Sequence, residues 1–155
     1  LTFPFGSYIC VMDIDPKTAE MKIRRFVAID DCGNIINPMI VTGQVHGGLA
    51  MGIAPAMYEE LIYDDEGNIL NGTFMDYLLP TSVETPNWET GHTITPSPHH
   101  PLGAKGVAES PTVGAPPAVA NAVVDALSHL GVTHVDIPVT PFKVWKILKE
   151  KGVIS

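Results

Sequence analysis

Residues 37–57, NPMIVTGQVHGGLAMGIAPAM, predict the helix around which the rest of the chain is arranged. Asn37 is a favourable N-cap, and Pro38 suits the first helical position because proline has no N–H to leave unpaired there. Pro55 lies late in the run, where a proline kinks or ends a helix. We therefore expect a helix at about residues 38–57.

Four glycines lie inside this predicted helix, at positions 43, 47, 48 and 52. Each interior glycine costs about 1 kcal/mol relative to alanine, so the four together cost about 4 kcal/mol. Close approach of a second backbone or of a ligand is the obvious compensation, because glycine has no Cβ to hold a neighbour away. The helix is expected to be buried and to carry such a contact.

A membrane span is the alternative for this segment, because residues 39–57 carry no charge and two glycine pairs have GxxxG spacing. Gln44, His46 and Pro55 argue against it, as do the strand patterns on either side. We expect no membrane span.

On the N-terminal side of the helix, alternating side chains predict an antiparallel pair of strands at residues 8–15 and 21–30. The apolar face of the second strand is expected to carry Met21, Ile23, Val27 and Ile29. Asp30 and Asp31 open the turn sequence DDCGN and are expected to be solvated turn charges.

On the C-terminal side, turn signals and periodicity predict further elements. They are a hairpin of residues 60–63 and 69–70, strands at 73–79 and 93–95, and helices at 117–130 and 141–151. The sum is an α+β fold: antiparallel hairpins packed with a buried Gly-rich helix and two further helices, in a single domain of residues 1–155.

Composition excludes several classes of function. The chain has 155 residues with 9 basic and 17 acidic side chains, a net charge of −8, which disfavours nucleic acid as a partner. Cys10 and Cys32 form no CxxC pair and are too few for an iron–sulfur cluster. They are read as reduced thiols of a cytoplasmic protein. The spacing of His46, His92 and the pair at 99–100 matches no zinc pattern, so no metal-ligating side chains are predicted.

The segment GAKGVAESP at residues 103–111 is the strongest candidate site. Its glycines allow backbone to approach a ligand closely, and Lys105 places a cation four residues before Glu109. Glu109 is either a general base aimed at a bound group or a solvated loop charge. Gln44, within the Gly-rich helix, can donate and accept hydrogen bonds, which suits a heterocycle edge such as a pterin or a neighbouring backbone group.

Several motifs together resemble the C-terminal region of the molybdenum hydroxylases, the xanthine oxidase family. Within that family the resemblance is greatest to the large subunit of aerobic carbon monoxide dehydrogenases. The motifs, in chain order, are DCGNIINP at 31–38, GQVHGG at 43–48, FMDYLLP at 74–80, TPSPH at 95–99 and GAKGVAE at 103–109.

This resemblance implies a cofactor and a role for each candidate residue. The large subunit of such enzymes holds molybdenum on molybdopterin, often as the cytosine dinucleotide, while partner subunits carry iron–sulfur clusters and FAD. Glu109 matches the carboxylate that faces the molybdenum, and Gln44 matches a glutamine that hydrogen-bonds the pterin. Lys105, Gly106 and Val107 match a segment that passes close to the cofactor.

The family's large subunit is several times longer than this chain, and the chain begins at Leu1 rather than Met. We therefore expect the C-terminal portion of the molybdopterin-binding domain of a larger catalytic subunit, inactive by itself. Its partners would be the remainder of that subunit, the iron–sulfur and flavin subunits, and a small-molecule substrate. Carbon monoxide, an aldehyde and an aromatic heterocycle remain open as substrates. A non-catalytic fragment that keeps the fold without cofactor is the alternative from another class.

Overall fold

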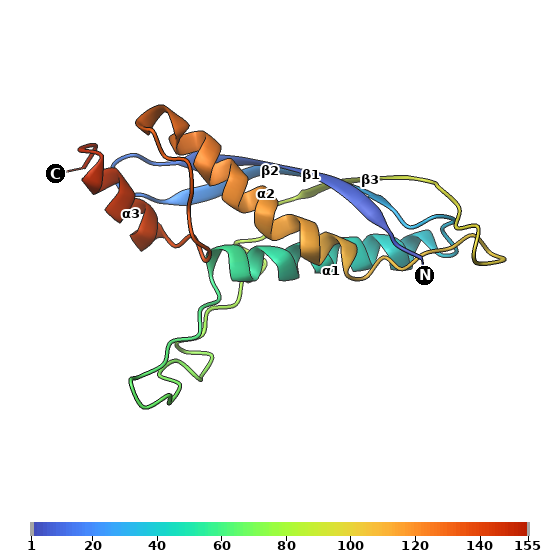
Figure 1. Cartoon of the computed structure of the whole chain (residues 1–155), viewed down its shortest axis with the longest axis horizontal. Helices are drawn as coiled ribbons and strands as arrows, with labels where there is room; N and C mark the ends of the chain where they lie inside the picture. The colour runs from blue at the N-terminus through green and yellow to red at the C-terminus, as the bar shows by residue number, and fades with distance from the viewer. Residues whose placement is uncertain (1, 155) are drawn as a thin grey trace.

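The chain forms a three-stranded sheet with two long helices beside it and a third helix near the C-terminus (Figure 1). The structure is a computed structural model that describes residues 2–154. Within that range, no helix is both long enough and apolar enough to cross a membrane. The elements are β1 (Phe5–Ile14), β2 (Met21–Asp31), α1 (Pro38–Met57), β3 (Trp88–Thr93), α2 (Ser110–Leu127), the 3-10 helix η1 (Ser128–Leu130) and α3 (Pro141–Glu150).

The sheet is mixed, with β2 in the middle. β1 and β2 pair antiparallel as expected, and β3 adds to β2 in parallel. The α+β class is confirmed, but the strands predicted at 73–79 and 93–95 are wrong. The predicted second hairpin is short: Tyr63 and Ile69 form an antiparallel bridge, and the Leu70 N–H donates to the Ile62 carbonyl at 2.8 Å. Residues 73–77 form bends and turns. The strand predicted at 93–95 lies at Trp88–Thr93, because pairing with β2 rather than local propensity decides its position.

A bulge in β2 corrects the predicted apolar face. The pairing passes from Val11 opposite Arg25 to Met12 opposite Ile23, so Arg24 is an extra residue in β2. One extra residue moves every later side chain to the other face of a strand. As a result Phe26 and Ala28 are buried together with Ile23, whereas Ile29 is exposed.

Helix α1 has the predicted bounds, and the Asn37 side chain accepts a hydrogen bond from the Ile40 N–H at 3.3 Å. Its glycines divide into two pairs. A Cβ at Gly48 would lie 3.0 Å from Pro111, and one at Gly52 would lie 2.6 Å from Ala115, both in α2. A Cβ at Gly43 or Gly47 would meet no atom within 4 Å. The expected backbone approach therefore accounts for one pair only, and the helix is buried on one side.

Helix α2 begins at Ser110, seven residues before the predicted start, and runs through Pro116 and Pro117. The prediction treated these prolines as a helix start, since each removes a backbone donor from a helix interior. Contacts with α1 and the sheet outweigh that loss: Ala115, Val119 and Val123 of this helix are fully buried. The terminal helix α3 lies where it was predicted, with Thr140 as its N-cap.

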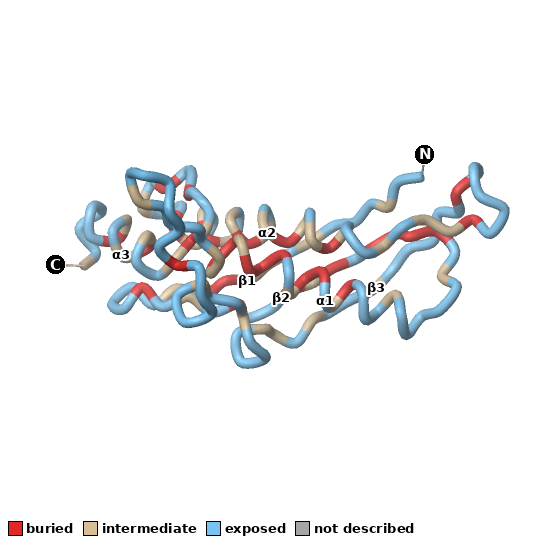
Figure 2. Tube along the Cα trace, turned by 90° about the horizontal axis from the view of Figure 1, so that it is seen from below, coloured by how far each residue is buried: buried red, intermediate tan, exposed pale blue. Residues whose placement is uncertain are grey.

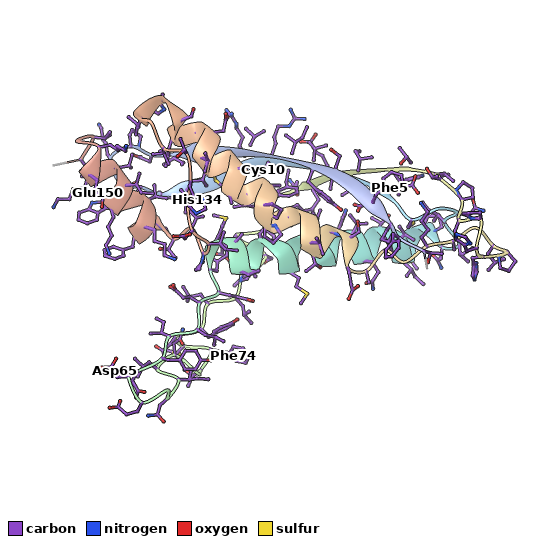
Figure 3. The ribbon with its side chains drawn as sticks, viewed as in Figure 1. Phe5, Cys10, Asp65, Phe74, His134 and Glu150 are labelled. Atoms are coloured by element: carbon purple, nitrogen blue, oxygen red, sulfur yellow. The ribbon has the colours of Figure 1, made fainter. Side chains whose placement is uncertain are left out.

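The hydrophobic core lies between the sheet and the helices. Figure 2 shows buried residues following α1, α2 and the strands, with shorter buried stretches in α3 and the loops. The core includes Phe26 of β2, Leu49 and Ile53 of α1, and Val119 and Val123 of α2. Residues 60–82 form an arm that projects away from this core, with Asp65 and Phe74 near its far end (Figure 3).

Candidate functional site

Glu109 lies at the junction of the segment 103–109 with α2, where it is the N-cap residue. Its side chain is exposed and makes no capping hydrogen bond. Within residues 2–154, no hydrogen bond or ion pair of this carboxylate is found. Glu109 lines two clefts, one of about 620 Å³ against α1 and one of about 580 Å³ against β1. The carboxylate is therefore available to a group that enters either cleft.

The cleft against α1, named here the first cleft, brings Gln44 and Glu109 together. Gly43, Gln44 and Gly47 of α1 form one wall, and Glu109 with the first turn of α2 forms the other. The Gln44 side chain is exposed, and the two glycines beside it leave the backbone open because nothing lies within 4 Å of their missing Cβ atoms. The structure therefore joins the two residues that the sequence singled out from separate motifs.

The other cleft, named here the second cleft, lies on the β1 side of Glu109. Phe5, Gly6 and Tyr8 contribute from β1, while Ser110, Val113 and Gly114 contribute from α2. The Tyr8 ring packs so closely on Gly114 that a Cβ there would lie 2.2 Å from it. This glycine therefore allows the ring to reach the beginning of α2.

The Lys105 side chain binds Asp31 and not Glu109. Its Nζ lies 3.1 Å from Oδ1 of Asp31 in a buried ion pair, and 4.7 Å from the centre of the Phe5 ring. Its backbone N–H donates to the Cys32 carbonyl at 2.7 Å. Gly106 is exposed and Val107 is half-buried against the core. The cofactor contacts of Lys105, Gly106 and Val107 stay predictions, and the Lys105 charge is held by a carboxylate of the chain itself.

Asp31 is fully buried, so its expected place as a solvated turn charge is wrong. It accepts from the N–H groups of Gly33 at 3.0 Å and Thr95 at 3.1 Å, and from the Thr93 hydroxyl at 2.9 Å. Burial would raise the pKa of this carboxyl, but these donors and the Lys105 ammonium outweigh burial and hold the pKa well below its usual range. Asp31 therefore stays ionised and holds Lys105 at the end of β2; we call this carboxylate the Asp31 anchor.

Asp30 is buried too, at 3% exposure, and the same expectation is wrong for it. Its Oδ1 accepts from the Tyr8 hydroxyl and, at 2.6 Å, from the Ser110 hydroxyl. These two hydroxyls lie 3.1 Å apart. Burial, followed by the bond to Asp30, raises the pKa of Tyr8 far above its usual value, so the phenol keeps its proton. Asp30 Oδ2 has no partner within residues 2–154.

Sequence reasoning missed both aspartates because their partners are distant in the chain. Asp31 and its partner Lys105 are 74 residues apart in the sequence, and Asp30 and its partner Ser110 are 80 residues apart. The only local signal was a pair of acidic residues ending a strand of otherwise apolar alternation. Pairing of β3 with β2 and packing of α2 exclude water there, which a turn motif does not reveal.

Metal-ligating side chains are not gathered in the part of the chain that the structure describes, where no cluster of three or more His, Cys, Asp or Glu could hold an ion. Cys10 and Cys32 are free thiols. Burial raises the pKa of Cys10 to about 12, so its thiol is protonated near neutral pH.

A family described as the molybdopterin cofactor-binding domain matches residues 1–86. The chain is 63% identical over 152 residues to the carbon monoxide dehydrogenase large chain of Hydrogenophaga pseudoflava, covering 98% of this chain and 19% of that one.

Two solved structures have folds similar to that of this chain. Reconstituted CO dehydrogenase from Oligotropha carboxidovorans matches with a TM-score of 0.94 and 55% identity, over 98% of this chain and 19% of that one. Quinoline 2-oxidoreductase from Pseudomonas putida 86 matches with a TM-score of 0.90 and 43% identity, over 94% and 18%. The chain spans about a fifth of the length of these relatives.

Proposed function

The chain belongs to the molybdopterin cofactor-binding domain family, and we propose that it is the C-terminal portion of that domain in the large catalytic subunit of a molybdenum-dependent oxidoreductase. Residues 1–155 form a single unit in this proposal, and the remainder of the subunit completes the site. The shared first cleft of Gln44 and Glu109 is the observation that carries it. A cleft with one carboxamide and one unpaired carboxylate suits a heterocyclic cofactor at which protons are exchanged.

The residues of the first cleft fit molybdopterin. Gly43 and Gly47 leave a stretch of α1 backbone without side chains, where a flat ring system can approach closely. Gln44 offers a donor and an acceptor to the edge of a pterin. We assign Gln44 as a pterin contact, and Lys105, Gly106 and Val107 as the segment that passes beside the cofactor. For Lys105 the contact would come from its backbone, since its ammonium is held by Asp31.

Glu109 is the proposed general base. When bound, the cofactor supplies the redox chemistry of its molybdenum. Glu109 accepts a proton from a reacting group in the first cleft on one carboxylate oxygen and later returns it to solvent. No residue from 2–154 competes for this carboxylate, so it needs to break no internal bond before it accepts the proton.

The substrate assignment rests on the relatives. Identity is 63% and 55% with carbon monoxide dehydrogenases and 43% with quinoline 2-oxidoreductase. We therefore propose carbon monoxide as the substrate, with an aldehyde or an aromatic heterocycle as the second candidate; quinoline 2-oxidoreductase supports the heterocycle. We further propose that the cofactor is the cytosine dinucleotide form and that partner subunits carry iron–sulfur clusters and FAD. The proposed location is the cytoplasm.

Glu109→Gln in the complete enzyme tests the assignment. We expect molybdenum and pterin contents to be unchanged, while turnover falls by about 10²–10⁴-fold, as is usual for loss of a general base. Turnover with carbon monoxide, an aldehyde and quinoline is measured in parallel to identify the substrate. Glu66→Gln is the matched control, because Glu66 is an exposed carboxylate in the distant arm. Wild-type turnover in Glu109→Gln, or enzyme without molybdenum, contradicts the proposal.

A further inference from the structure

Two consecutive aspartates at the end of β2 hold the two ends of the segment that carries Glu109. Asp31 binds Lys105 at the beginning of this segment, and Asp30 binds Ser110 at its end. Glu109 is the residue immediately before Ser110, so its backbone is fixed by a hydroxyl one residue away. Its own carboxylate takes no part in this fixing.

The two anchors differ in how completely they are bonded. Asp31 accepts from four groups, and both of its oxygens have partners. Asp30 has both of its bonds on Oδ1 and leaves Oδ2 unpartnered within residues 2–154. The side-chain hydrogen bonds of Asp30 therefore all go to hydroxyl groups beside Glu109, whereas those of Asp31 also go to two backbone N–H groups.

The position of Tyr8 links the Asp30 anchor to the site. Tyr8 and Ser110 both line the second cleft beside Glu109, and their hydroxyls lie 3.1 Å from each other. Tyr8 comes from β1, Asp30 from β2 and Ser110 from α2, so three elements converge on one residue of α2. The Glu109 carbonyl in turn accepts the Val113 N–H at 3.1 Å, which joins Glu109 to the first turn of the helix.

We propose that Tyr8, Asp30 and Ser110 are positioning residues that hold Glu109 in place at the first cleft. This rests on the proposed role of Glu109 as general base. The three side chains act through Ser110. Its hydroxyl donates to Asp30 and lies 3.1 Å from the Tyr8 hydroxyl, so Ser110 is tied to β1 and β2, which restricts the backbone that carries Glu109 at the edge of the first cleft. A misplacement of about 1 Å at such a base can lower turnover by about 10²-fold.

Ser110→Ala in the complete enzyme is the central test. We expect kcat to fall at least tenfold with KM and molybdenum content unchanged, and Ser110→Thr to restore most of kcat because it returns the hydroxyl. Hydrogen exchange of the peptide covering residues 107–114 is expected to accelerate in Ser110→Ala and to return toward wild type in Ser110→Thr. Ser128→Ala, at the opposite end of α2, is the matched control, since within residues 2–154 its hydroxyl bonds only the Asp125 carbonyl.

Tyr8→Phe and Asp30→Asn extend the test. Tyr8→Phe keeps the ring that packs on Gly114 and removes one bond from Asp30, so it is the mildest variant and is expected to lower kcat less than Ser110→Ala. Asp30→Asn keeps an Oδ1 that can accept from both hydroxyls and loses the charge, so it is also expected to lower kcat less than Ser110→Ala. Wild-type kcat and exchange in Ser110→Ala and Tyr8→Phe overturn the positioning role. If these variants are unaffected while Glu109→Gln is inactive, only this inference fails; if Glu109→Gln itself is active, the proposed function fails.

Discussion

The surroundings of Glu109 divide into a packed side, where α1 and β2 contact α2, and an open side, which faces the first cleft. Glycines and carboxylates occur on both sides. On the packed side, Gly48 and Gly52 of α1 touch α2, and the carboxylates of Asp30 and Asp31 are buried. On the open side, glycines 43 and 47 of the same helix meet nothing within 4 Å, and the Glu109 carboxylate is exposed.

The difference teaches that residue type does not decide function here; the surroundings do. A glycine that allows two helices to meet adds to stability through packing, whereas a glycine with an empty neighbourhood lowers stability unless a ligand occupies the space. Likewise a buried carboxylate with all its partners anchors the chain, and an exposed one without partners is free to react. Substitutions of the helix glycines and of Asp31 on the packed side should therefore act on stability, and those on the open side on cofactor binding or turnover.

The largest effect is expected for the charge on the packed side. Asp31→Leu leaves the Lys105 ammonium buried without its partner and is expected to lower the free energy of unfolding by about 3–5 kcal/mol. Urea unfolding of the large subunit measures it. Lys105→Met is expected to have a smaller effect, because Asp31 keeps three other donors. Equal effects of the two substitutions would contradict this asymmetry.

Acid should weaken the same anchor. Because the pKa of Asp31 is held below its usual value of about 3.9, the unfolded chain takes up a proton at a higher pH than the folded one. The stability that Asp31 contributes is fully present above that value and is lost as the pH falls below it toward the folded pKa. Unfolding midpoints measured from pH 6 down to pH 3 should show this loss in wild type and a shallower loss in Lys105→Met. Identical profiles would mean that Lys105 does not contribute to the lowered pKa of Asp31.

Local sequence signals were sufficient where one segment decides its own structure. The Asn37-Pro38 start of α1 and the β1–β2 pairing were predicted because caps and alternation are read within a few residues. Gln44 and Glu109 are 65 residues apart in the chain, so no local pattern predicts that they line one cleft. Only the family resemblance assigned both of them to the same cofactor.

Long-range packing explains what the sequence did not predict. The bulge at Arg24, which reverses the buried face of β2, has no local marker. The buried state of Asp30 and Asp31 depends on residues beyond position 90, and α2 continues through two prolines because its other face is covered. Each of these features is set by what packs against the segment rather than by the segment.

The smallest effect on stability, and the clearest contrast between the two sides, is expected from a matched pair in α1. Gly52→Ala places a Cβ 2.6 Å from that of Ala115, and overpacking of this kind lowers the free energy of unfolding by about 1–3 kcal/mol. Gly47→Ala meets no atom within 4 Å and is expected to raise it by up to about 1 kcal/mol through helix propensity alone.

Cofactor content should respond in the opposite order. Gly47 lines the first cleft, so its added methyl group occupies space that we assign to the pterin, and the molybdenum content of purified Gly47→Ala enzyme is expected to fall although the chain is more stable. Gly52 lies outside the residues that line this cleft, and the folded fraction of Gly52→Ala should keep its molybdenum. A stabilised Gly47→Ala enzyme with full molybdenum content would mean that the open glycines face something other than the cofactor, because a methyl group on a wall in contact with a pterin cannot be accommodated without displacing it.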